Sequence, residues 1–266
     1  MRNLLAANFL RLRKNKLFWG LLAFSTGFGA LVAFNYYEMS QIEPITLDGA
    51  FFTYPLTVCI LTAVFVPLFF GREYSDSAIR NKVAAGHPRA AIYAANLLTG
   101  TAVSLLLCAA YMAVVAAIGI PLVGPVSMDP GQAVLMVLGS LAAMAACSAL
   151  STLVSMACTS KSISAVVCIL GVFLLLIASI YLRSRLDAPE FYELPWGEGL
   201  VENPQCLSGT QRAVCEFVYN LLPPSQAIQY ASRQTQNLGQ MPLYSLLVIL
   251  LSTEAGIALF RRKDLK

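Results

Sequence analysis

Charge and histidine are both scarce in this sequence. Asp, Glu, Lys and Arg together make up 12% of the 266 residues, and 58% of the residues are hydrophobic. Because soluble domains carry about a quarter charged residues, this composition excludes an ordinary soluble protein and predicts an integral membrane protein. His87 is the single histidine, which excludes a histidine-based metal cluster, and its place beside Pro88 predicts a solvated loop side chain. The net charge of +4 does not indicate a nucleic-acid partner, because the distribution of the charges matters more than their sum.

Sequence motifs for nucleotide chemistry are also missing. No Gly-x-x-x-x-Gly-Lys-Ser/Thr phosphate loop occurs, so a nucleoside triphosphate has no standard site in this chain. The run LSGTQR, from Leu207 to Arg212, is similar to the LSGGQ signature of ATP-binding-cassette ATPases, but neither a phosphate loop nor a Walker-B strand accompanies it. We interpret the run as a coincidence in which Thr210 caps a helix. We therefore predict that the chain is not an enzyme and binds no cofactor or metal of its own.

Long apolar runs are what the sequence does contain. A helix needs about 20 apolar residues to cross roughly 30 Å of hydrocarbon, and six runs meet this requirement. They lie at about residues 17–37, 51–70, 92–120, 132–158, 162–182 and 242–260. We predict an all-α membrane protein with a single transmembrane domain over residues 1–266. A cleaved signal peptide fits poorly, because the first run is too long and no small-x-small cleavage site follows it.

Lysine and arginine are distributed unevenly about these spans. Five lie in residues 1–16, four in the loop 71–90, and four in the last six residues. The opposite side has four, all in the long loop 183–240, together with most of the acidic residues. By the positive-inside rule, we predict a multi-pass protein of the cell membrane with both termini in the cytoplasm.

The N-terminal 16 residues are amphipathic. Leu5, Phe9 and Leu12 fall on one helical face, and the basic residues occupy other faces. This pattern favours a helix that lies in the cytoplasmic membrane interface, although a plain charged anchor would also fit.

The external loop 183–240 is too long for a simple connection. It can form short helices at about residues 211–222 and 225–235, which would rest on the membrane or cover the outer mouth of the bundle. Cys206 and Cys215 both lie in this loop, on a side that favours disulfides if it is oxidising. We hypothesise that they form a disulfide.

Two further features lie within the spans. The fourth span is rich in small residues, which let helix backbones approach closely in lipid and indicate a tightly packed bundle. Glu254 is the one acid well inside a span. Ionisable groups at such depth are costly and often functional, but Arg261 follows seven residues later. We therefore expect the Glu254 carboxylate to reach toward the cytoplasm or to contact Arg261. A role in transport is the less favoured alternative.

The segment 71–90, GREYSDSAIRNKVAAGHPRA, is a polar insert between two apolar runs. Asp76 is suited to cap a helix over residues 77–85, and Gly86 is suited to the position after its end. Pro88 prevents continuation. A helix of two to three turns is marginal alone, so we expect it to pack on something.

The predicted helix has a small apolar face. Ile79 and Val83 lie four residues apart, and Glu73, Arg80 and Lys82 surround them. A loop held to the membrane surface by its basic residues is the simpler interpretation, but it leaves the acidic start of the segment without a role. We therefore predict a contact face for another protein.

The run Glu73-Tyr74-Ser75-Asp76-Ser77-Ala78-Ile79-Arg80-Asn81-Lys82 resembles the first cytoplasmic loop of permeases in the ABC-2 family of ATP-binding-cassette exporters. In that family an E-Y-S-x-x-x-I-R-N-K-like stretch forms the helix that docks on the ATPase. The six spans, the basic N-terminus, the run Leu222–Gln226 and the ending Leu259–Asp264 are also similar to the family. The long external loop with its two cysteines departs from it. The residues that the resemblance assigns to ATPase coupling are Glu73, Tyr74, Ser75, Asp76, Ile79, Arg80, Lys82 and Val83.

This resemblance implies a membrane unit of two permease subunits, identical or different, with a separate cytoplasmic ATPase dimer that binds ATP and Mg. The docked helix would transmit ATP-driven motion to an export path between the subunits. Two other classes stay open. One is a membrane sensor or immunity protein that binds a ligand with its external loop. The other is a secondary transporter or membrane enzyme, which would need several intramembrane ionisable groups, whereas only Glu254 qualifies.

Overall fold

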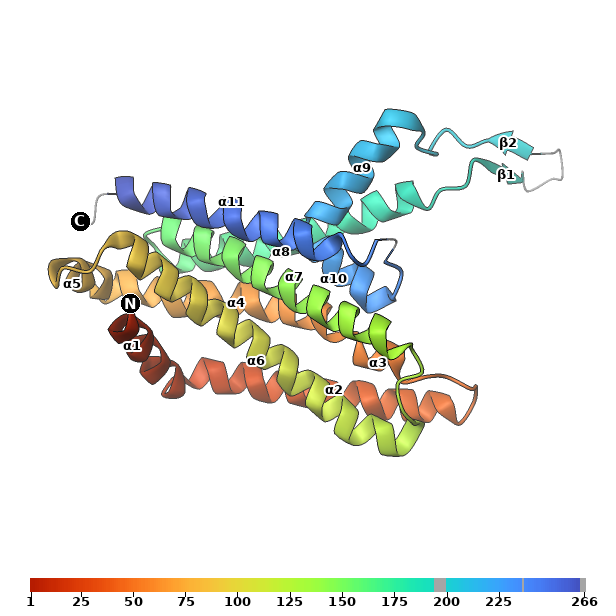
Figure 1. The fold of residues 1–266 in the computed structure, drawn as a ribbon, viewed down its shortest axis with the longest axis horizontal. Helices are drawn as coiled ribbons and strands as arrows, with labels where there is room; N and C mark the ends of the chain where they lie inside the picture. Colours follow the sequence, from red (N-terminus) through yellow and green to blue (C-terminus); the bar gives the residue numbers. More distant parts are fainter. Residues whose placement is uncertain (194–199, 236, 264–266) are drawn as a thin grey trace.

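The computed structural model describes residues 1–193, 200–235 and 237–263. Six helices in it are long and apolar enough to cross a membrane, and they form the body of the molecule (Figure 1). They are α2 (Lys16–Ser40), α4 (Tyr54–Ser75), α6 (Arg89–Val123), α7 (Pro130–Ala157), α8 (Lys161–Leu186) and α11 (Met241–Arg262). Each overlaps one predicted span, so the prediction of an all-α, six-span membrane protein is confirmed.

Shorter elements gather at the two ends of this bundle (Figure 1). The basic end, as we call the end that carries most of the lysines and arginines, holds α1 (Arg2–Arg13), α5 (Ala78–Ala84) and the last turn of α11. The far end holds α3, α9, α10 and an antiparallel pair of short strands, in which Phe191 pairs with Glu202. These far-end elements are α3 (Asp48–Phe51), β1 (Phe191–Glu193), β2 (Leu200–Glu202), α9 (Gly209–Leu221) and α10 (Pro223–Ser232). The strand pair was not predicted.

The centre of the bundle is α4. Its most apolar stretch is 72% buried, whereas the corresponding stretches of α2 and α11 are only 22% buried. It packs against α6, α7, α8 and α10. A movement of α4 would therefore disturb most of the bundle, because close-packed interiors transmit strain.

Small side chains let α7 pack closely against its neighbours. Gly139 lies against the Tyr230 hydroxyl of α10, so closely that an added Cβ would clash with it. The Ser140 hydroxyl is hydrogen-bonded to the Tyr54 hydroxyl of α4. Ala143, Ala146, Ser148 and Ala149 are buried as well. The prediction that the small residues of this span serve packing is confirmed.

The two short helices before the last span differ from prediction in their starts and in their placement. α9 begins at Gly209 after Ser208, so Thr210 lies inside the helix and does not cap it. α10 does not rest on the membrane, because it is buried between α4, α7 and α8. The hydroxyls of Ser225 and Ser179 lie 2.5 Å apart, and Gln226 Oε1 accepts a hydrogen bond of 2.6 Å from Ser245. These polar contacts fasten α10 to α8 and α11.

Candidate functional site at the basic end

Glu73 lies at the centre of a buried polar cluster. α4 continues beyond the predicted span and carries Glu73 near its last turn, where the carboxylate side chain has no exposed surface. Arg11 of α1 and Lys82 of α5 both form ion pairs with its Oε1, and Lys82 Nζ lies at 2.6 Å. Its Oε2 accepts a hydrogen bond of 3.2 Å from Asn96 Nδ2 of α6. One carboxylate therefore joins four helices.

Asn8 extends this cluster across the interface between α1 and α6. Its Nδ2 donates to Asn96 Oδ1 at 2.9 Å and to Thr99 Oγ1 at 3.2 Å, and its Oδ1 accepts from Lys82 Nζ at 3.4 Å. Buried polar groups are costly unless they are hydrogen-bonded, and these amides bond to one another. The sequence reasoning missed Asn8 and Asn96. Two features of the sequence could have pointed to them. Asn8 lies between Leu4 and Leu12 on one helical face, and Asn96 is a lone amide near the start of an uncharged span.

The face of α1 that packs on the bundle shares only Leu12 with the apolar stripe that was predicted to lie in the membrane interface. Leu4, Asn8 and Leu12 are buried, whereas Phe9 of the predicted stripe is exposed and Leu5 is half-buried. This buried face was not predicted from the sequence, because it contains an amide and a search for apolar periodicity rejects such a face. Phe9 stays available to the membrane interface, so the interfacial placement of α1 remains a prediction.

The caps of α5 were predicted in part. Asp76 follows the end of α4 and does not cap α5, which begins after Ser77 in a left-handed conformation (φ 55°) with no side-chain cap. At the other end, Gly86 adopts φ 83°. Its N–H donates to Val83 O at 3.0 Å, and the N–H of His87 donates to Lys82 O at 3.2 Å. This is the Schellman arrangement that ends many helices, so the predicted role of Gly86 is confirmed.

The structure turns the predicted contact face inward. Ile79 is 1% exposed, and Val83 packs against the same small apolar cluster. Glu73 and Lys82 belong to the ion cluster. These residues are thus occupied within the chain, because so short a helix is stable only when its apolar side packs on its neighbours. The exposed residues of segment 71–90, among those the structure describes, are Arg72, Asp76, Ser77, Arg80, Asn81, Ala84, Ala85, Gly86 and Pro88. The side chain of Ser75 lies outside the described part of the structure.

Two basic side chains fasten the ends of α7 and α11 beside this cluster. Lys263 Nζ donates to the last carbonyls of α7, those of Met156, Ala157 and Cys158, at 2.9 to 3.0 Å. It also lies 4.1 Å from the centre of the Tyr74 ring. Tyr74, which the resemblance assigns to coupling, donates its hydroxyl to Met156 O at 2.7 Å. Burial lowers the pKa of Lys263.

Arg89, at the start of α6, binds α11 in the same way. Its Nη1 donates to the carbonyls of Phe260, Arg261 and Lys263 at 2.6 to 2.9 Å. Cations at helix C-termini are favourable because of the helix dipole. The segment around α5 is therefore tied to α1, α4, α6, α7 and α11.

The remaining predicted residues lie apart from this cluster. Cys206 and Cys215 are both free thiols, so the hypothesised disulfide is not formed. Cys206 lies in the turn before α9, and Cys215 lies within that helix. Glu254 is exposed on α11, and no ion pair joins it to Arg261 in the described structure. Among the described residues, no group of three or more His, Cys, Asp or Glu side chains could hold a metal ion.

In comparisons with known proteins, no family model matches this chain, and no curated protein matches it either.

Proposed function

We propose that this chain is the permease subunit of an ATP-binding-cassette exporter and couples to a separate cytoplasmic ATPase through residues 71–90. The observation that carries the proposal is the mounting of α5. Its inner side is fastened by Ile79 and by the ion pair of Lys82 with Glu73, while its outer side exposes Arg80 and Asn81. A short helix that is rigidly held on one side and polar on the other is suited to receive a force from a soluble partner.

The connections of α5 indicate how such a force would spread. Only the turn at Asp76 and Ser77 separates α5 from α4, the most buried of the six spans. Glu73 joins the same point to α1 and α6. Ion pairs and hydrogen bonds between rigid helices are the kind of contact through which sites are coupled. In this proposal ATP and Mg bind to the partner ATPase dimer, and a second permease subunit, identical or different, completes the export path.

The contact face that we propose differs from the one predicted from the sequence. Asp76, Arg80 and Asn81 replace Ile79 and Val83, because the latter two are occupied within the chain. A substitution of Ile79 by Asp would test folding and not docking. Arg80 is the better probe, because its exposed side chain forms no ion pair among the described residues.

The test uses the tagged chain purified from its own host in mild detergent. We expect MgATP-dependent phosphate release to copurify with the wild-type chain and to fall strongly in Arg80→Glu, because a reversed charge at a partner contact is repulsive. Lys14→Glu is the matched control, since Lys14 is also an exposed cation at the basic end. Equal losses in the two variants, or ATPase activity that Arg80→Glu leaves intact, would contradict the docking role of α5.

A further inference from the structure

The outer face of α11 is largely uncovered by the rest of the fold. α11 runs along one side of the bundle (Figure 1), and only 22% of its most apolar stretch is buried. It packs against α6 and α7, and its buried residues include Ser245, Ser252, Gly256 and Phe260. Apolar side chains on the outer face need no protein partner, because lipid is as apolar as they are. A polar side chain on that face does need one.

Glu254 is such a side chain. It is exposed on α11, and its carboxyl group forms no hydrogen bond and no ion pair in the part of the chain that the structure describes. It lies about 10 Å along the helix from Arg261 at 1.5 Å per residue, and so lies inside the hydrocarbon core of roughly 30 Å. Long lysine and arginine side chains reach the headgroups from near the helix ends, but the shorter glutamate side chain does not.

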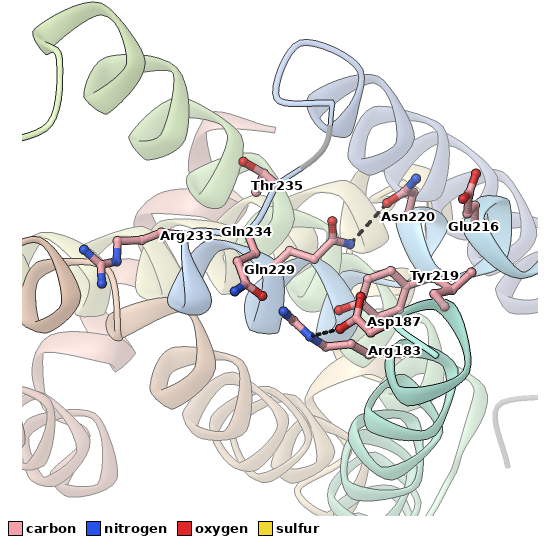
Figure 2. Close-up of a pocket in the computed structure, with 10 residues that line it drawn as sticks. Arg183, Asp187, Glu216, Tyr219, Asn220, Gln229, Arg233, Gln234 and Thr235 are labelled. Atoms are coloured by element: carbon pink, nitrogen blue, oxygen red, sulfur yellow. Dashed lines mark hydrogen bonds and ion pairs between the residues drawn. The ribbon is translucent and has the colours of Figure 1, made fainter. Parts of the chain in front are cut away.

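Three acidic side chains that lie against the bundle contrast with Glu254. Glu73 is bonded within the basic end, and Asp48 accepts hydrogen bonds from backbone N–H groups of the loop between α6 and α7. Figure 2 shows Asp187 joined to Arg183, at 3.2 Å, beside a cavity of about 460 Å³ at the far end. Each of these carboxylates is satisfied within the chain. Glu254 is not, and the hydrocarbon around it holds no water to take that role.

The residues around Glu254 have the spacing of a coiled coil. Leu243, Leu247, Leu250 and Glu254 follow one another at intervals of four, three and four residues, and all four are exposed. Apolar residues at this spacing pack between two helices as knobs into holes, and a single polar residue among them fixes the register. Ala258, one turn further on, is exposed as well, and a small residue lets two helices approach closely in lipid.

A second copy of this chain matches that face. Two copies in one membrane have parallel α11 helices, and a two-fold axis between them brings the same surface of each copy together. Glu254 then faces Glu254 of the second copy. A protonated carboxyl group both donates and accepts hydrogen bonds, so the two groups satisfy each other and leave no charge in the hydrocarbon. Because α9 contacts α11 at Tyr244, near the far end, the contact is centred on the half of α11 nearer the basic end.

We propose that two copies of this chain associate through the outer faces of α11, with the two Glu254 carboxyl groups hydrogen-bonded at the centre of the contact. Lipid chains offer no hydrogen-bonding group to Glu254, and an unrelated helix would have to carry one at the same depth. The proposed function leaves the second membrane subunit identical or different, whereas this inference makes it identical. It rests on α11 alone, and neither of its experiments contains an ATPase.

The first test is photo-crosslinking in the membranes of cells that express the full chain with two different tags. We expect benzoylphenylalanine in place of Leu250 to give a crosslinked species that carries both tags. The same group in place of Leu174, which is 65% exposed on α8, is the control and should give none. Equal yields at the two positions, a crosslink from position 250 to a different polypeptide, or no crosslinked polypeptide would overturn the second copy as the occupant.

The second test measures the dissociation constant of the dimer by energy transfer between terminally labelled chains in liposomes. Glu254→Gln is the matched control and should associate as the wild type does, because an amide also donates and accepts. Glu254→Leu should raise the dissociation constant about tenfold, as the loss of about two interhelical hydrogen bonds predicts. The side chain is exposed in the single chain, so folding should persist. Equal dissociation constants for Glu254→Leu and the wild type would overturn the carboxyl pair.

Discussion

Replacing Glu73 by Gln should destabilise the basic end far more than the loss of one surface charge would. The substitution keeps the shape of the side chain and its contact with Asn96, but leaves Arg11 and Lys82 without their counter-ion. Breaking a buried ion pair by removing one partner costs about 3–5 kcal/mol. Arg11 is 37% exposed and so is screened by water, whereas Lys82 is 15% exposed. Because the water-screened Arg11 contributes less to this cost, we expect the free energy of unfolding to fall by about 3 kcal/mol, the lower end of that range.

The assay is thermal unfolding of the purified chain in detergent, with Glu43→Gln as the matched control. Glu43 is exposed, and no ion pair involves it in the described structure. For a chain of this size, about 3 kcal/mol corresponds to a decrease of roughly 6–12 °C in Tm, and the control should change little. If the Tm values of the two variants agreed within about 1 °C, on the same scale, the ion cluster would not stabilise this end as we argue.

A double-mutant cycle separates the ion pair from other effects of the substitution. In Glu73→Gln the Lys82 ammonium has lost its carboxylate partner, and Lys82→Met removes that unpaired charge. The double variant should therefore lose less free energy of unfolding than the two single variants lose in sum. Contacting residues couple by about 0.5–3 kcal/mol. Additive losses would mean that Lys82 and Glu73 do not stabilise each other, and that α5 is held mainly by the burial of Ile79.

Two further predictions test the packing at the far end and the state of its cysteines. Gly139→Ala should lower the free energy of unfolding by about 1–3 kcal/mol through overpacking, because the added Cβ would clash with the Tyr230 hydroxyl. Gly171→Ala is the control, since no atom lies within 4 Å of its new Cβ. In the same thermal assay this control should be neutral or stabilising. Alkylation in denaturant without reductant, followed by peptide mass spectrometry, should find Cys206 and Cys215 both modified, and a linked pair of peptides would contradict their description as free thiols.

Some of the local structure followed from the sequence because it depends on backbone chemistry alone. Gly86 ends α5 in a left-handed conformation, which glycine adopts without steric cost. Pro223 and Pro224 separate α9 from α10 and begin the latter, since proline is favoured in the first turn of a helix, where its missing N–H leaves no hydrogen bond unmade. The predicted cap at Asp76 failed because α4 continues through Ser75, and propensity does not reveal how far a packed helix extends.

The candidate site was found by its position in the chain but not by its geometry. Segment 71–90 was recognised from its polarity, whereas Asn8 and Asn96 were missed and Ile79 was assigned to the wrong side. Asn8 and Asn96 lie 88 residues apart in the chain, so only the packing of α1 on α6 reveals that they meet. Once α1 and α6 supply an apolar surface, Ile79 packs there and is no longer exposed to a partner.

The sequence by itself determined that six helices cross a membrane and that one short polar helix joins the second to the third. Length and hydropathy suffice for this, because backbone polar groups in hydrocarbon must be satisfied within each helix. Only the tertiary structure decided which side of each helix faces inward. A span that is apolar all round has no hydrophobic stripe to mark its buried face, and lipid is as apolar as leucine. The choice therefore depends on close packing and hydrogen bonding between helices, such as Gly139 against Tyr230 and Glu73 against Lys82.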